Sequence, residues 1–243
     1  FCHGFKGFKD WGCWNLVANL FVENGFKFLK FNFSHNGGTL ENPTDFPDLQ
    51  SFSLNNYSIE LNDVQRVMDY IVLRNYISKY EQIYIIGHSR GGGIACLSTV
   101  NNPQINKLVS WAGVANFKER FPENEELEQW KKNRIRYISN SRTNQEMPIS
   151  IKFYNDFIEN ESKLSIKTAL LNYSGKFLAC FGSFDQVVPN QYALDMAKWA
   201  TNSSIFKIRT NHTFGSKHPW TKTNLPDSLK EVCIKTIDFL KSD

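Results

Sequence analysis

The feature that most constrains the fold is a serine set among glycines, in residues 87–92 (GHSRGG). The apolar segment 82–86 directly before it predicts a strand buried on both faces of a parallel sheet, and the apolar segment 94–100 after it predicts a helix. Glycines two positions before and after Ser89 permit a turn so sharp that strand and helix backbones leave no room for side chains. We therefore expect Ser89 at a strand end and at a helix N-terminus, where negative charge is favoured.

The rest of the chain alternates between helix and strand patterns. The spacing of apolar residues predicts helices at residues 14–24, 60–79 and 226–240, and short apolar runs predict strands at residues 26–31, 107–111, 176–181 and 205–208. This alternation predicts one α/β domain over residues 1–243, with a mostly parallel sheet and helices on both of its faces.

Three parts of the chain depart from this alternation. Residues 39–58 are polar and predict no regular element. Residues 113–170 are charged and rich in aromatic side chains, and we expect them to form a small inserted lid or cap; a long crossover with its own helices is the alternative. The opening Phe1-Cys2-His3-Gly4 resembles a strand end that enters a loop, so we expect the first strands of the sheet to precede residue 1.

Composition and charge argue against several classes of protein. The formal net charge is only +4 and the basic residues are scattered, whereas nucleic-acid binding requires a concentrated basic face. No apolar run approaches the roughly 18 residues that span a bilayer, so no transmembrane segment is predicted. The five cysteines form no CxxC pair, so neither a disulfide framework nor a zinc site is indicated. We expect a reducing, cytoplasmic location unless a signal peptide precedes residue 1.

Two residues further along the chain supply the groups that a reactive serine requires. A serine hydroxyl is a weak nucleophile until a base takes its proton, and that base is commonly a histidine held by a buried carboxylate. Asp185 follows the predicted strand 176–181, and His212 follows the predicted strand 205–208. Both side chains are therefore expected at the carboxyl edge of the sheet. We predict Ser89 as nucleophile, His212 as base and Asp185 as the acid that orients the base.

Other assignments of these roles remain open. His218 is the rival base, although it lies further from the last strand and nearer the last helix. His3 and His88 are expected to be structural. Asp185 has an alternative role as a turn residue that caps a helix beginning near Asn190.

Acyl transfer through a serine also requires two convergent backbone N–H groups that stabilise the tetrahedral oxyanion. The residue after the nucleophile, Arg90, is expected to supply one of them. The other is expected from an early loop after a strand, and residues 3–7 (HGFKG) make the N–H of Phe5 the best candidate.

Taken together, these motifs resemble the α/β-hydrolase superfamily. The resemblance rests on residues 3–5 (HGF), on 87–92, on Asp185 followed by Val188-Pro189, and on 212–214 (HTF). Within the superfamily the chain is most similar to compact esterases, namely dienelactone-hydrolase-like proteins and cinnamoyl or feruloyl esterases. The resemblance implies an α/β-hydrolase fold, the order nucleophile, acid, histidine along the chain, and a serine hydrolase that uses neither cofactor nor metal.

The implied reaction is cleavage of small-molecule esters with short acyl or aryl groups through an acyl-enzyme. Ser89 stands where true dienelactone hydrolases have a cysteine, which favours ester hydrolysis. A peptidase or thioesterase with the same triad, or a hydrolase-fold receptor with little turnover, is the alternative. Five aromatic side chains are expected to line the substrate pocket, although each has core packing as its alternative role: Trp111, Phe117, Trp130, Tyr154 and Phe157.

Overall fold

A computed structural model describes residues 1–78 and 81–242. Its main sheet has four strands in the order β1-β2-β5-β6, and neighbouring strands are parallel throughout. These strands are β1 (Ile83–His88), β2 (Ile105–Trp111), β5 (Lys176–Gly182) and β6 (Ser203–Ile208). The predicted parallel sheet is therefore confirmed, and only the predicted strand at residues 26–31 lies outside it.

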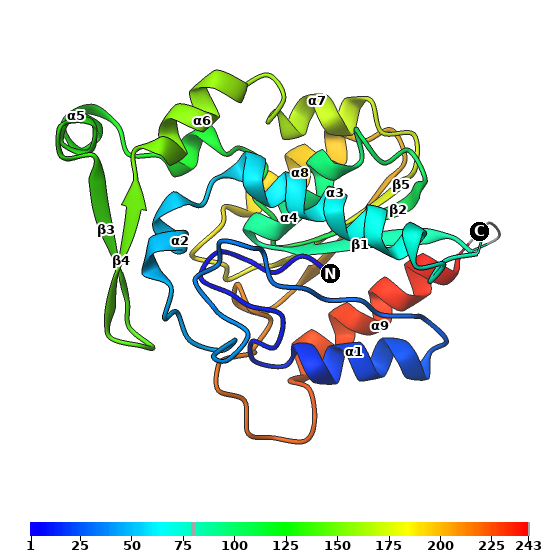
Figure 1. The fold of residues 1–243 in the computed structure, drawn as a ribbon. Helices are drawn as coiled ribbons and strands as arrows, with labels where there is room; N and C mark the ends of the chain where they lie inside the picture. The colour runs from blue at the N-terminus through cyan, green and yellow to red at the C-terminus, as the bar shows by residue number, and fades with distance from the viewer. Residues whose placement is uncertain (79–80, 243) are drawn as a thin grey trace.

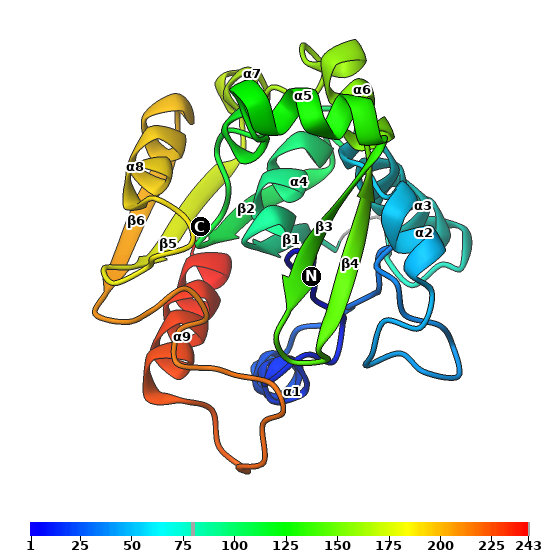
Figure 2. The same cartoon turned by 90° about the vertical axis from the view of Figure 1, so that its left-hand side faces the viewer.

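Helices cover both faces of this sheet (Figures 1 and 2). On one face lie α1 (Trp14–Glu23) and α9 (Asp227–Lys241). On the other lie α3 (Tyr57–Leu73), α4 (Arg90–Ser98), α7 (Ile166–Leu171) and α8 (Asn190–Trp199). Successive side chains of a strand point to opposite faces, so Leu108 of β2 joins the cluster under α4 while Val109 joins the cluster with α1 and α9. Both faces are apolar because both are covered.

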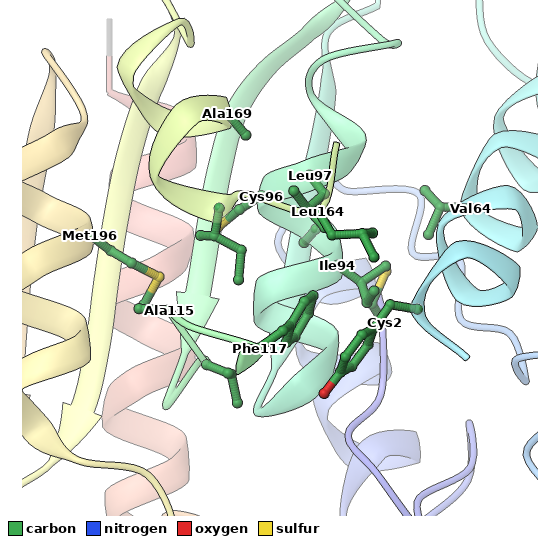
Figure 3. Close-up of a cluster of buried hydrophobic side chains, with 14 of the residues drawn as sticks. Cys2, Val64, Ile94, Cys96, Leu97, Ala115, Phe117, Leu164, Ala169 and Met196 are labelled. Carbon is green, nitrogen blue, oxygen red and sulfur yellow. The ribbon is translucent and has the colours of Figure 1, made fainter. Parts of the chain in front are cut away.

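The larger apolar cluster fills the space between the sheet and the layer of α3, α4, α7 and α8. Figure 3 shows side chains from distant parts of the chain meeting there, among them Cys2, Ile94 and Phe117. Phe117 stacks on Tyr57 with 3.8 Å between ring centroids and 8° between ring planes. This stack joins α3 to the segment that follows β2.

The prediction of a strand at residues 26–31 is wrong for this structure, since the segment forms no ladder with any described strand. Its neighbour on the side of β1 is the start of the chain. The Phe1 ammonium donates to the carbonyl of Leu29 at 2.7 Å, and Cys2 forms an isolated parallel bridge with Gly87. A single bridged residue, Cys2, does not make a ladder, so segment 26–31 has no strand as a partner among the described residues.

The helices differ from expectation at their ends. The predicted helix at 60–79 is α3, which begins at Tyr57 because the Asn56 side chain accepts a hydrogen bond from the N–H of Ile59; residue 79 lies outside the described residues. The region 39–58 contains α2 (Leu49–Leu54), which is likewise capped by a side chain, that of Asp48. None of the helices in the described part of the chain is long and apolar enough to cross a membrane.

The segment between β2 and β5 contains helices, which the crossover alternative included, and an antiparallel hairpin that the sequence pattern did not predict. Its elements are the short 3₁₀ helix η1 (Lys118–Arg120), α5 (Asn124–Asn133), the hairpin of β3 (Ile135–Asn140) and β4 (Gln145–Ser150), α6 (Lys152–Asn160) and α7. The hairpin is a sheet of its own and stands beside α2 (Figure 1). A lid or cap role for residues 113–170 stays a prediction.

A pair of leucine substitutions tests this assignment of the core. Leu108 is fully buried in β2, so Leu108→Ala should lower the free energy of unfolding by about 2–5 kcal/mol. Leu73, at the end of α3, is 78% exposed, so Leu73→Ala should change it by less than about 0.5 kcal/mol. Urea unfolding measures both values. Equal losses in the two variants would contradict the assignment.

Candidate active site

Ser89 occupies the turn between β1 and α4, in a backbone conformation that is unusual for a non-glycine residue. Its φ is 57° and its ψ is −123°. The turn is fixed from both sides, because the N–H of Ser89 donates to Trp111 at 2.9 Å and its carbonyl accepts from Gly92 at 2.9 Å. Such conformations persist only where the surrounding structure over-determines them, and they cluster at functional sites.

Two glycines of the motif are required by close contacts between backbones. A Cβ on Gly87 would stand 2.1 Å from the carbonyl oxygen of Gly91. A Cβ on Gly91 would stand 2.4 Å from the carbonyl oxygens of Cys2 and His3. The contact of Gly87 with Gly91 is the close approach of strand and helix that the glycine pattern predicts, and the contact of Gly91 shows that the first turn of α4 also packs against the loop that opens the chain.

The His212 side chain lies between Ser89 and Asp185. Its Nε2 is 2.9 Å from the Ser89 Oγ, and its Nδ1 is 2.7 Å from the Asp185 Oδ2. The three residues come from the carboxyl ends of β1, β5 and β6, which meet at one edge of the parallel sheet. The structure thus brings together the three residues that the sequence nominated.

Asp185 is held as a carboxylate. Its side chain is 1% exposed, and its Oδ1 accepts hydrogen bonds from the N–H groups of Val187 at 2.8 Å and Val188 at 3.0 Å. Burial raises the pKa of Asp185, but the hydrogen bonds from His212, Val188 and Val187 outweigh burial and leave that pKa below its usual value. The α8 cap is Pro189, and Asp185 serves the His212 ring instead of capping that helix.

His88 supports the loop that carries His212. It is buried, and its Nε2–H donates to the carbonyl oxygen of His212 at 3.0 Å. Burial, reinforced by the nearby His212 ring, lowers the pKa of His88 to about 3, so His88 stays neutral near neutral pH. His88 is a packed residue, in agreement with the sequence-based expectation.

His3 has a comparable structural position in the opening loop. Its Nδ1–H donates to the carbonyl oxygen of Gly4 at 2.9 Å, and its Nε2 accepts from the N–H of Phe33 at 3.3 Å. Burial is the main cause that lowers the pKa of His3 to about 4. The rival base His218 lies elsewhere: its Nδ1 accepts from Gly12 at 2.9 Å and its ring packs on Phe8.

The two candidate oxyanion donors lie beside Ser89. Arg90 is the first residue of α4, so its N–H has no acceptor within the helix. A Cβ on Gly4 would stand only 3.0 Å from the Cβ of Ser89, so the Phe5 N–H follows a residue in direct contact with the nucleophile. Within residues 1–78 and 81–242, the Phe5 backbone makes no hydrogen bond, so its N–H is available to a ligand.

The Arg90 side chain has a partner that the sequence analysis missed. Its Nη1 lies 3.3 Å from the Oε1 of Glu60, in the first turn of α3, and the same oxygen accepts from Asn55 at 2.7 Å. Burial raises the pKa of Glu60, and Arg90 and Asn55 oppose that shift. In the sequence Glu60 is only an early helix residue, so no local pattern pairs it with Arg90.

Four of the five predicted pocket residues lie in the segment between β2 and β5. Phe117, Trp130 and Phe157 are each at most 3% exposed, and the Trp130 Nε1–H donates to the carbonyl oxygen of Ile149 at 2.9 Å. With Tyr154, which is partly exposed, they surround the Phe121 and Tyr57 rings and pack the insertion onto α3. Phe117, Trp130 and Phe157 therefore have the alternative role, that of core packing.

The predicted pocket role is wrong for Trp111. It is fully buried on the opposite face of the sheet, and its Nε1–H donates to Thr236 of α9 at 3.0 Å. Trp111 is therefore a core residue beneath α1 and α9. The apolar strand that carries it is buried on both faces, and the sequence alone does not distinguish the two faces.

Other parts of the surface do not add to this site. Two hollows in the described surface, one between α4 and α7 and one between the loop before α2 and the β3–β4 hairpin, include none of the five predicted pocket residues. Among the residues that the structure describes, no group of three His, Cys, Asp or Glu side chains is arranged to hold a metal ion.

Comparison with known proteins gives a consistent picture. The family model described as alpha/beta hydrolase fold matches residues 1–145, and no curated protein sequence matches the chain significantly. The chain superposes on Est1E from Butyrivibrio proteoclasticus, solved with ferulic acid bound, with a TM-score of 0.72 and 17% identity, covering 98% of this chain and 86% of that one.

Two further solved structures are similar to the chain over nearly its whole length. A monoacylglycerol lipase from Paleococcus ferrophilus has a TM-score of 0.68 and 14% identity, with 98% and 91% of the two chains covered. The mouse alpha/beta hydrolase domain-containing protein 10 has a TM-score of 0.70 and 14% identity, with 99% and 88% covered. At such identities the likeness shows the fold.

The two buried histidines predict how stability depends on pH. In the unfolded chain histidine binds a proton below about pH 6.5, whereas the lowered pKa values of His3 and His88 keep both rings neutral in the folded protein. Their contribution to stability is therefore complete above pH 6.5 and decreases as the pH falls, by up to about 1.4 kcal/mol per pH unit for each ring.

Urea unfolding of the parent and of His88→Gln at pH 7, 6 and 5 measures this contribution. The free energy of unfolding should fall less steeply with decreasing pH in the variant than in the parent, because one ring that titrates only in the unfolded chain is removed. Identical slopes would show that His88 titrates normally in the folded protein.

Proposed function

Because this chain belongs to the α/β-hydrolase fold family, we propose that it is a carboxylic-ester hydrolase in which Ser89, His212 and Asp185 form the catalytic triad. One observation carries the proposal: the His212 ring lies within hydrogen-bond distance of the Ser89 Oγ on one side and of the Asp185 carboxylate on the other. A base in this position removes the proton from the hydroxyl that attacks.

Acylation follows from this geometry. The Ser89 Oγ attacks the acyl carbon of the ester while its proton passes to the His212 Nε2, which is 2.9 Å away. The resulting imidazolium is stabilised by the Asp185 carboxylate, whose Oδ2 accepts from the Nδ1–H. The same Nε2 then donates the proton to the departing alcohol oxygen, and the acyl group remains on Ser89.

Stabilisation of the oxyanion is assigned to the N–H groups of Phe5 and Arg90. The carbonyl oxygen of the ester becomes negatively charged in the tetrahedral intermediate, and fixed donors that point at it lower the barrier. Among the described residues, neither N–H has a partner that the oxyanion would have to displace. The N-terminus of α4 adds the favourable end of its dipole at the same place.

Deacylation reuses the same groups. Water gives a proton to the His212 Nε2 as it attacks the acyl carbon, and collapse of the second tetrahedral intermediate releases the carboxylic acid and restores the Ser89 hydroxyl. The cycle thus consumes one ester and one water molecule and releases one alcohol and one carboxylic acid.

The substrate class proposed is small esters with short acyl or aryl groups. Est1E is described with ferulic acid bound and the second similar structure is described as a monoacylglycerol lipase, and both descriptions are compatible with small ester substrates for this chain. Of the aromatic side chains clustered around Tyr57, Phe121 and Tyr154 keep part of their surface exposed, and they are the ones proposed to meet the acyl or aryl groups.

Kinetics of triad variants test this proposal with p-nitrophenyl acetate and butyrate. Ser89→Ala and His212→Ala should each lower kcat by at least about 10³-fold, because either change removes the nucleophile or its base. His218→Ala is the matched control, since His218 lies away from Ser89, and it should keep the activity of the parent. Unchanged turnover in Ser89→Ala would contradict the mechanism.

Covalent labelling separates an enzyme from a binding protein with the same fold. A fluorophosphonate probe should label the parent at Ser89, and the label should be lost in His212→Ala but kept in His218→Ala, because phosphonylation uses the same base. A folded parent that refuses the probe and still binds a small ester would favour the receptor function.

A further inference from the structure

The Arg90 side chain contacts the ring of the other candidate oxyanion donor. The Cζ of its guanidinium lies 3.8 Å from the centroid of the Phe5 ring. The Phe5 ring also stacks on Phe52 of α2, with 5.6 Å between centroids and 28° between planes. Phe5 is therefore held between a cation and a second aromatic ring.

This contact adds to a hold on the neighbouring peptide: the Gly4 carbonyl, which shares a peptide plane with the Phe5 N–H, accepts from the Gly7 N–H at 3.0 Å and from the His3 Nδ1–H at 2.9 Å. A donor that is to bind an oxyanion must stay free of protein acceptors, and in the described chain neither the N–H nor the C=O of Phe5 is hydrogen-bonded. The neighbouring Lys6 has a φ of 54°, in the left-handed region, so the loop bends sharply at this point. The Gly4 carbonyl thus holds the peptide plane of the Phe5 N–H from one side, and the Phe5 ring, packed against Arg90 and Phe52, holds the residue from the other.

Arg90 is itself anchored to a helix. Its Nη1 pairs with the Oε1 of Glu60 at 3.3 Å, and the two side chains are 12% and 4% exposed. Asn55 donates to the same oxygen at 2.7 Å, and the Arg90 guanidinium also lies 5.3 Å from the Tyr57 ring and 5.2 Å from the Phe153 ring. A buried pair of this kind is strongly disturbed when one partner is removed, because the other charge is left without compensation.

We propose that Glu60, Arg90 and the Phe5 ring form an oxyanion clamp, in which Glu60 and the Arg90 side chain act as positioning residues for the two backbone donors. The inference rests on the proposed esterase function. One donor is the N–H of Arg90 itself, and the other is the N–H of the residue whose ring the Arg90 guanidinium covers. Glu60 connects both of them to α3, so these side-chain contacts add to the close packing of Gly4 and Gly91 in setting the spacing between the donors.

A double-mutant cycle tests the clamp with p-nitrophenyl butyrate. Phe5→Ala and Arg90→Met each leave the backbone N–H in place but remove the contact, so each should lower kcat by about 10- to 100-fold while KM stays near the parent value. The double variant should be no slower than the slower single variant, since both changes break the same contact. Losses that multiply in the double variant would overturn the clamp.

Substitutions of Glu60 test the anchor. Glu60→Gln keeps an oxygen that accepts from Arg90 and should retain most of the kcat of the parent, whereas Glu60→Leu should fall to the level of Arg90→Met. Arg142→Met is the matched control, because Arg142 pairs with Asp45 at 2.9 Å and lies 5.7 Å from the Phe8 ring, without contacting Phe5 or Ser89. An equal effect of Arg142→Met would assign the losses to general destabilisation and overturn the clamp.

Two further measurements separate failure of the clamp from failure of the proposed function. Inhibition by a boronic acid, which forms a tetrahedral adduct with a reactive serine, should weaken in Arg90→Met in proportion to the loss of kcat, provided that urea unfolding shows the variant folded. Parent-like inhibition in a folded variant would overturn the clamp alone. A parent protein that neither turns over the ester nor takes up a fluorophosphonate would overturn the esterase function and the clamp with it.

Discussion

The arrangement at the sheet edge depends on one imidazole ring that is hydrogen-bonded at both of its nitrogens. His212 can reach Ser89 and Asp185 together only because β1, β5 and β6 are parallel and end at the same edge. The loops after these strands are held in turn: Asp185 by two backbone N–H groups, and His212 by the ring of His88. Each polar contact therefore relies on the register of the apolar strands beneath it.

Two features of the site lower the stability of the fold, and close packing around them compensates for that loss. Ser89 is held in a strained conformation, and a carboxyl at Glu60 is buried beside the guanidinium of Arg90. The close backbone contacts of Gly91 and the two apolar layers on the sheet keep these groups in place. Strain and buried charge are accordingly concentrated where the proposed chemistry needs fixed donors, which is a common feature of active sites.

The main sheet and the grouping of Ser89, Asp185 and His212 could be predicted from the sequence, because local sequence patterns indicate them. The glycines around Ser89 reflect direct backbone contacts, and the parallel strands show as short apolar runs, so the sheet and the meeting of the three polar residues followed. Pairings between distant segments that no such local pattern marks were not predictable. The strand expected at residues 26–31 lacks a partner ladder, Trp111 lies on the unexpected face of a strand buried on both sides, and Glu60 meets Arg90 only through the packing of α3 on α4.

A crystal structure of the protein inactivated by an alkyl phosphonate would show the triad and both oxyanion donors together, because the adduct mimics the tetrahedral intermediate. We expect phosphorus bonded to the Ser89 Oγ, one phosphoryl oxygen within hydrogen-bond distance of the N–H groups of Phe5 and Arg90, and the His212 ring between the adduct and Asp185. Phosphorus on another residue, or a phosphoryl oxygen turned away from both N–H groups, would contradict the proposed mechanism.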